Sequence, residues 1–79
     1  MYSYRYLILK RSSGKWNFED AFMTEEAADK HAELLSLGRN RVKVIERYED
    51  ETHTARILRI FYYYDGRYHH TITKQEDTV

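Results

Sequence analysis

The sequence predicts a small α+β domain in two layers, an antiparallel β-sheet with one helix on one face, in the chain order β-β-α-β-β-β. Three observations predict this fold. Residues 56–64 are rich in β-branched and aromatic side chains, which is typical of a strand. The dipeptide Asp65-Gly66 follows them and favours a type I′ hairpin. Residues 24–26, a threonine and two glutamates, indicate the beginning of a helix between the strands.

Two strands at residues 2–11 and 16–23 are expected to form a first hairpin around a polar turn that contains a glycine. A four-residue loop places Leu9 opposite Phe18. A loop that differs by one residue would exchange the two faces, so the face that meets the helix stays open at this point. With the four-residue loop, one face carries Leu7, Leu9, Phe18 and Phe22, and the other carries Tyr4, Tyr6, Ile8 and Ala21.

The helix should begin after Thr24 as its N-cap and end near Leu37, with Gly38 as the C′ residue. The two glutamates in its first turn complement the positive end of the helix dipole. Apolar residues at a spacing of three or four positions form its buried stripe. These residues are Ala27, Ala28, His31, Leu34 and Leu35.

Residues 41–48 predict a third strand, which an acidic turn connects to the fourth. A register that places Val44 opposite Leu58 and Val42 opposite Ile60 joins apolar side chains across the two strands. We therefore expect the helix to cover these four residues. The Asp-Gly turn then sets the last hairpin, and residues 74–79 are polar and expected to fray. The predicted pairs of this hairpin are Tyr64 with Arg67, Tyr63 with Tyr68, Phe61 with His70 and Arg59 with Ile72.

Composition limits the possible classes of protein. The 79 residues fit one domain, 1–79, and the absence of cysteine is compatible with a cytoplasmic location, which we expect. No apolar run approaches the roughly 20 residues of a membrane span, and the N-terminus lacks a signal-peptide pattern. The net charge is zero, but residues 1–18 carry cations and no acid, whereas residues 19–37 are acidic.

A single helix cannot cover both faces of strands whose two faces are both apolar. The face away from the helix should therefore form a larger apolar patch than is usual on a monomer. We expect it to carry Ile45, Ile57, Phe61, Tyr63, Tyr68, His70 and Ile72 among the cations Lys43, Arg47 and Arg59. Tyrosine and arginine are enriched at protein interfaces. The predicted binding residues are Lys43, Arg47, Ile57, Arg59, Phe61, Tyr63, Tyr68 and His70.

The leading hypothesis from this face is a non-enzymatic module that binds a protein partner, or a second copy of itself as a homodimer. A sheet that curls strongly and packs this face on itself is the structural alternative. Nucleic acid is the alternative partner from a different class, because tyrosine stacks on bases while arginine and lysine hold phosphates. The zero net charge and the lack of an RNP-type motif count against nucleic acid.

Catalytic and metal-binding patterns are not found. His69 and His70 are neighbours on a predicted strand and point to opposite faces, His31 lies on the buried stripe of the helix, and His53 lies in a turn. A zinc site needs several converging ligands. The sequence also has no glycine-rich phosphate loop and no nucleophile motif. It therefore predicts no enzyme, no metal and no cofactor.

The strand that ends at Phe22, followed by Thr24-Glu25-Glu26-Ala27, resembles a strand-to-helix pattern found in many small domains, including the arm-binding domains of phage integrases. That resemblance implies a sheet able to bind DNA and carries no residue role with it. In size and composition the chain is also similar to small phage proteins that bind and disable host factors, such as anti-CRISPR and other anti-defence proteins. This second resemblance implies a phage-type inhibitor of a host or defence protein.

Overall fold

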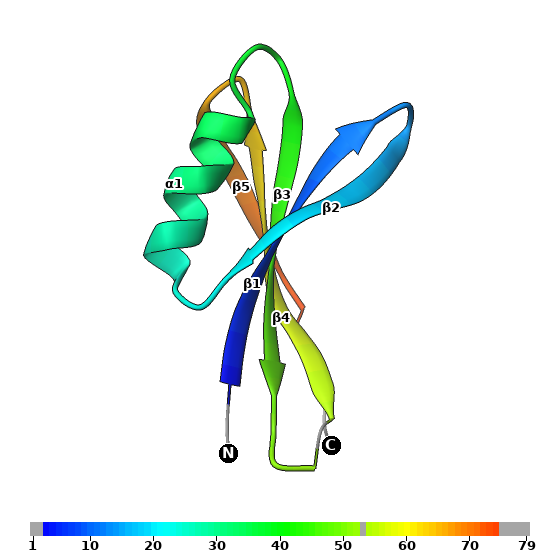
Figure 1. Cartoon of the computed structure of the whole chain (residues 1–79), viewed down its shortest axis with the longest axis vertical. Coiled ribbons are helices and arrows are strands. Elements are labelled where there is room, and N and C mark those ends of the chain that lie inside the picture. Colours follow the sequence, from blue (N-terminus) through cyan, green and yellow to red (C-terminus); the bar gives the residue numbers. More distant parts are fainter. Residues whose placement is uncertain (1–2, 53, 75–79) are drawn as a thin grey trace.

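The computed structural model describes residues 3–52 and 54–74 and confirms the predicted α+β fold. The strands form one antiparallel sheet in the order β2-β1-β3-β4-β5, and the helix covers one of its faces (Figure 1). No helix among the described residues is long and apolar enough to cross a membrane. The elements are β1 (Ser3–Ser12), β2 (Lys15–Phe22), α1 (Glu25–Leu35), β3 (Arg41–Glu49), β4 (Ala55–Tyr64) and β5 (Arg67–Thr73).

The helix begins where the sequence predicts, but it ends at Leu35 with Ser36 as its C-cap, two residues before the predicted end near Leu37. The Thr24 hydroxyl accepts a hydrogen bond from the Ala27 N–H at 3.2 Å, which satisfies a donor that the first turn leaves free. Gly38 follows the helix with a φ of 79°, the left-handed conformation that glycine adopts without strain. The expected stripe is partly wrong, because Leu34 is 69% exposed while Ala28 is completely buried.

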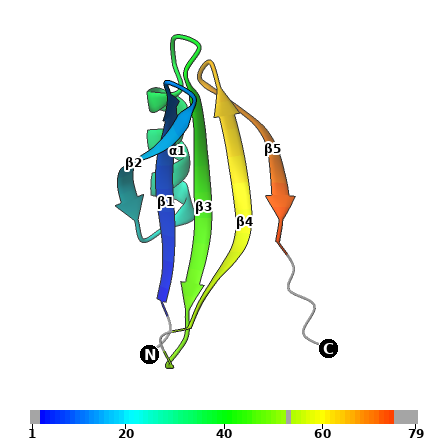
Figure 2. The same cartoon turned by 90° about the vertical axis from the view of Figure 1, so that its right-hand side faces the viewer.

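The core lies between the helix and one face of the sheet. Beneath the small residues Ala28 and Ala32, three strands contribute Tyr6, Ile8, Val42, Val44, Phe61 and Tyr63. The prediction that the helix covers Val42 and Val44 is therefore confirmed. The prediction for Ile60 is wrong, because its place in the register puts it on the opposite face, outside this core cluster. Figure 2 shows that opposite face with the helix behind it.

A bulge explains the error in β4. Tyr48 pairs with Arg56, whereas the predicted register places it opposite Thr54. A shift of two residues alone leaves each side chain of β4 on its predicted face of the sheet. The pairs Arg47–Ile57 and Glu46–Arg59 then leave Leu58 without a partner, so Leu58 is the extra residue of a β-bulge. Above the bulge the total shift is three residues. An odd shift reverses the faces, so residues 59–64 present their alternate side chains to the side opposite the predicted one.

Two further bulges act in the same way. Between β1 and β2, the predicted pair Leu9–Phe18 is confirmed, but an extra residue, Glu19, moves Phe22 to the helix side and Ala21 to the other face. Between β4 and β5, the pairs set by the Asp-Gly turn, Tyr64–Arg67 and Tyr63–Tyr68, are confirmed. The extra residue there is His69, so His70 pairs with Tyr62 and not with Phe61.

The expected frayed tail, residues 74–79, lies outside the described residues except for Lys74. The Lys74 N–H donates to the Leu58 carbonyl at 2.7 Å, which extends the contact between the end of β5 and β4 by one residue.

Candidate functional site: the open face of the sheet

The face of the sheet away from α1, called here the open face, carries a row of aliphatic side chains that crosses four strands. Leu7 of β1 pairs with Ile45 of β3, Ile45 pairs with Ile60 of β4, and Ile60 pairs with Ile72 of β5. Directly paired residues point to the same face, so the four side chains form a continuous band, called here the aliphatic stripe. Ile72 is 41% exposed at its end, whereas Ile60 is 7% exposed between its neighbours.

Cationic side chains border this stripe on both sides. Two residues along the strands in one direction lie Arg5 and Arg47, which pair with each other. Lys43 lies two residues from Ile45 in the other direction along β3 and pairs with Leu9 and with Tyr62. Beyond them, at the end of the sheet near the hairpin turns, the open face carries Arg11, Arg41 and Arg67. The stripe therefore has two arginines, Arg5 and Arg47, on one side and one cation, Lys43, between Leu9 and Tyr62 on the other.

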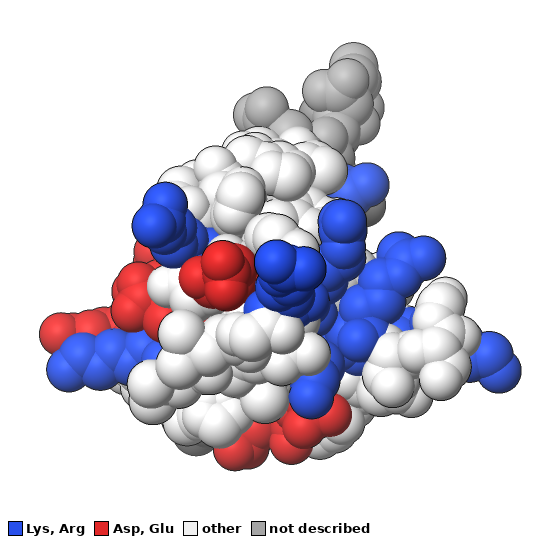
Figure 3. All heavy atoms as spheres, turned by 90° about the horizontal axis from the view of Figure 1, so that it is seen from above, with Lys and Arg blue, Asp and Glu red and all other residues white. Residues whose placement is uncertain are grey.

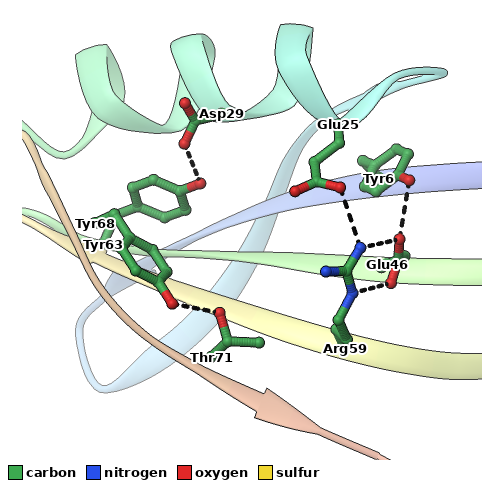
Figure 4. Close-up of polar contacts among 8 residues, drawn as sticks. All are labelled: Tyr6, Glu25, Asp29, Glu46, Arg59, Tyr63, Tyr68 and Thr71. Carbon is green, nitrogen blue, oxygen red and sulfur yellow. Dashed lines mark hydrogen bonds and ion pairs between the residues drawn. The ribbon is translucent and has the colours of Figure 1, made fainter.

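On the helix side of the sheet, a cluster of charged residues around Arg59 is joined by ion pairs and hydrogen bonds. The Arg59 guanidinium donates to the Glu46 carboxylate at 2.6 Å and to the Glu25 carboxylate at 3.1 Å, and the Tyr6 hydroxyl donates to Glu46 at 2.9 Å (Figure 4). Arg59 holds the pKa of Glu46 below its ordinary value, against the effect of burial. Burial and the neighbouring Glu46 raise the pKa of Tyr6 to about 12. Every charge in this cluster has an opposite partner.

Cations on the open face lack such partners. Among the described residues, Arg5, Arg11, Arg41, Lys43, Arg47 and Arg67 form no ion pair. The strands β1, β3, β4 and β5 place one carboxylate, Glu49 at the end of β3, on this face. Burial, together with the nearby Arg11, lowers the pKa of Lys43, so its positive charge is unfavourable in the isolated protein. Figure 3 shows many lysines and arginines on the side away from the helix.

Aromatic rings fill the end of the open face near the hairpin turns. The Lys43 ammonium lies 4.5 Å from the centre of the Trp16 ring, and Trp16 meets Tyr62 edge-on at 6.5 Å. Tyr62 in turn stacks on His70 at 4.8 Å. A hollow of about 550 Å³ lies beside these rings, between the tip of the β1–β2 hairpin and the β4–β5 hairpin. One face of the Tyr62 ring is therefore taken by His70, and one face of the Trp16 ring is taken by Lys43.

Four of the eight predicted binding residues lie on the open face. These are Lys43, Arg47, Ile57 and His70. The predicted set of binding residues did not include seven others on this face, which are Arg5, Leu7, Arg11, Trp16, Arg41, Ile60 and Tyr62. The signal for Trp16 was its place opposite Arg11 across the confirmed part of the first hairpin, where the two side chains form a cation–π contact at 5.8 Å.

The other four predicted binding residues lie on the helix side, so their placement on the open face is wrong. Phe61 and Tyr63 are 7% and 4% exposed in the core beneath α1. The Tyr63 hydroxyl donates to Asp29 of the helix at 2.6 Å. Arg59 belongs to the charge cluster described above, and Tyr68 lies beside Tyr63 with its hydroxyl 2.6 Å from that of Thr71 (Figure 4). The bulge at Leu58 causes this exchange of faces.

Within the described part of the chain, no group of three or more His, Cys, Asp or Glu side chains is arranged to hold a metal ion. The comparisons with known proteins found no matching family model, no similar curated protein and no similar solved structure. The geometry of the open face is therefore the basis for the functional argument.

Proposed function

We propose that the chain is a non-enzymatic protein-binding module that holds its partner against the open face of the sheet. One observation carries the proposal: an apolar stripe with no helix or strand over it is bordered by cations that have no carboxylate partner, while Arg59 on the helix side is paired with two carboxylates. A protein surface that combines apolar side chains with carboxylates would satisfy both features. Arginine and aromatic residues, which this face contains, are enriched in such interfaces.

Charge argues against a symmetric homodimer through this face. A twofold contact brings the same patch of both copies together. The cations Arg5, Lys43 and Arg47 of one copy would then meet those of the other, and like charges across an interface cost several kcal/mol. We therefore favour a different protein over a second copy.

Nucleic acid is the second candidate, favoured by the same unpaired cations, since phosphate groups would also neutralise them. It is less well supported, because recognition of single strands relies on rings that are free to stack. Here Tyr62 already stacks on His70, and Lys43 lies over Trp16. The two candidates differ in salt dependence, because binding that releases counterions from phosphates weakens steeply as salt rises.

A site-specific cross-linking experiment tests the proposal. A photo-reactive amino acid replaces Ile57, which is 42% exposed on the open face, and in a matched control it replaces Leu34 on the outer side of α1. In a lysate of cells that naturally contain the protein, we expect one cross-linked protein from position 57 and none from position 34. Lys43→Glu with Arg47→Glu should remove the product, whereas Lys30→Glu, on the exposed helix surface, should not.

Equal products from both positions, or a product insensitive to the charge reversal, would contradict the proposal. A cross-link to nucleic acid in place of protein would favour the second candidate. A phage-type inhibitor of a host or defence protein remains our prediction for the biological role.

A further inference from the structure

We propose that the segment bound on the open face is an amphipathic α-helix of the partner, with an apolar stripe and acidic side chains along both flanks, lying across the strands on the aliphatic stripe. This inference rests on the proposed function and specifies the chemistry of the partner. It follows from the order of apolar and cationic rows on this face.

The dimensions of the stripe fit a short helix. Neighbouring strands lie about 4.8 Å apart, so the stripe from β1 to β5 is roughly 14 Å long. A helix rises 1.5 Å per residue, so about ten residues, or nearly three turns, cover this length. Residues two apart on a strand are about 7 Å apart, so Arg47 and Lys43 lie about that far on either side of Ile45. A helix with its side chains is about 10–12 Å wide, which brings carboxylates on both flanks within reach of these cations.

A helix satisfies the backbone hydrogen bonds that this face cannot supply. The open face presents side chains, and its strands already pair with one another. An extended segment laid on it would lose water from its N–H and C=O groups without gaining partners, which is costly. A helix bonds these groups internally.

The charge pattern sets the direction of the bound helix. Along β3, the open face reads Arg41, Lys43, Ile45 and Arg47. A helix parallel to this strand would press its apolar stripe on three cations in succession. A helix across the strands places that stripe on Leu7, Ile45, Ile60 and Ile72 and places its flanks on the cations.

The helix of a second copy does not fit this description. The apolar stripe of α1 consists mainly of alanines that its own sheet covers. Two of its acids, Glu25 and Asp29, already bind Arg59 and Tyr63. The occupant is therefore expected on a different chain.

Three synthetic peptides test the inference. The probe has leucines along one side of about four helical turns and glutamates on both flanks. One control replaces the glutamates with lysines, and the other keeps the composition but scrambles the order so that no stripe forms. We expect the probe to bind at least tenfold more tightly than either control, as measured by fluorescence anisotropy at about 150 mM salt.

Variants of the protein locate the binding site. Lys43→Glu with Arg47→Glu should weaken binding of the probe at least tenfold, and the matched charge reversal Lys30→Glu should leave it unchanged. Circular dichroism confirms that each variant is folded. If the first pair unfolds, the exposed residue Arg5, which pairs with Arg47 beside the stripe, offers a second variant, Arg5→Glu, for which weakening is also expected.

Equal binding of the scrambled peptide, no binding of the probe, or no effect of either charge reversal would overturn the inference. The peptide experiment can fail while the proposed function still holds. A protein cross-linked at position 57, with no binding of the acidic helix, leaves the binding module intact and rejects only the helix. Sedimentation equilibrium of the protein without peptide tests for self-association. If the chains form a dimer through the open face and the probe only displaces the second copy, the natural occupant is that copy, and the inference is also rejected.

Discussion

The two faces of this sheet are built from the same strands and differ in what completes them. On the helix side, Ile8 and Val44 are buried beneath alanines, and Arg59 has two carboxylate partners. On the open face, the aliphatic stripe has no layer above it, and the neighbouring cations are unpaired. The comparison teaches that one face is covered by the chain's own helix, whereas the other has no second layer and is the face that we propose a partner covers. Stability should therefore depend on the first face, and binding on the second.

Truncating one aliphatic residue on each face should give the largest contrast. Ile8→Ala removes a completely buried side chain from the core and should cost about 3 kcal/mol of the free energy of unfolding, because it leaves a cavity under the helix. Ile72→Ala at the end of the stripe should cost less than about 1 kcal/mol. Urea denaturation measures both. Equal losses would mean that the open face is already covered in the isolated protein, for example by self-association.

Removing the carboxylate at the centre of the helix-side cluster should give the next largest effect. Glu46→Gln leaves Arg59 without its main partner and should cost about 2 kcal/mol at pH 7, less than for a fully buried pair because Arg59 is partly exposed. Arg59 holds the native pKa of Glu46 below the ordinary value of 4.5. The stabilisation is therefore complete above about pH 4.5 and is lost as the pH falls through the native pKa.

Urea denaturation at pH 7, 5 and 3 tests the sign of this dependence. The wild-type protein should lose stability between pH 5 and pH 3, and the Glu46→Gln variant should lose less over the same interval. The reason is that the variant lacks the carboxylate of Glu46, so its unfolding takes up about one proton fewer than that of the wild type. Glu26→Gln, an exposed change of the same kind on α1, is the control and should keep the wild-type slope. Parallel curves for wild type and Glu46→Gln would show that this pair does not contribute to acid unfolding.

Replacing Lys43 on the open face should have the smallest effect on stability, and it should stabilise the protein where the substitutions above destabilise it. Burial and Arg11 lower the pKa of Lys43, so its charge opposes folding. Lys43→Met keeps an unbranched apolar side chain at this position but removes the charge and its cation–π contact with Trp16, and it should raise the free energy of unfolding by about 0.5 kcal/mol. The same change should weaken binding of the acidic probe peptide. A loss of stability would show that the cation contributes to the fold through Trp16.

The sequence and the structure agree most closely where an element depends on local chemistry. The Thr24 cap and the left-handed Gly38 in the turn after the helix are local signals, because a side-chain oxygen or a missing Cβ acts on the adjacent backbone. The Asp65-Gly66 turn is another, since both residues adopt the positive φ values that a type I′ turn requires. The order of elements and the existence of a face without cover followed from these signals and from the count of apolar residues.

Agreement is lost at the bulges. Asp50 accepts hydrogen bonds from the N–H groups of Thr52 and Thr54 in the turn between β3 and β4. Tyr48 at the end of β3 therefore pairs with Arg56 and not, as predicted, with Thr54. The bulge at Leu58 then changes a shift of two residues into a shift of three. No local pattern of polar and apolar residues distinguishes a bulged leucine from a paired one, because both faces of β4 are apolar.

The sequence by itself determined that this protein is a two-layer domain with one helix, capped and turned at the predicted residues, and that some apolar surface would remain uncovered. Only the tertiary structure decided which side chains form that surface. The physical reason is the period of two along a strand, by which one unpaired residue inverts every side chain beyond it. Phe61 and Tyr63 therefore belong to the core, and the face that we propose for a partner carries Ile45, Ile72 and their cationic neighbours.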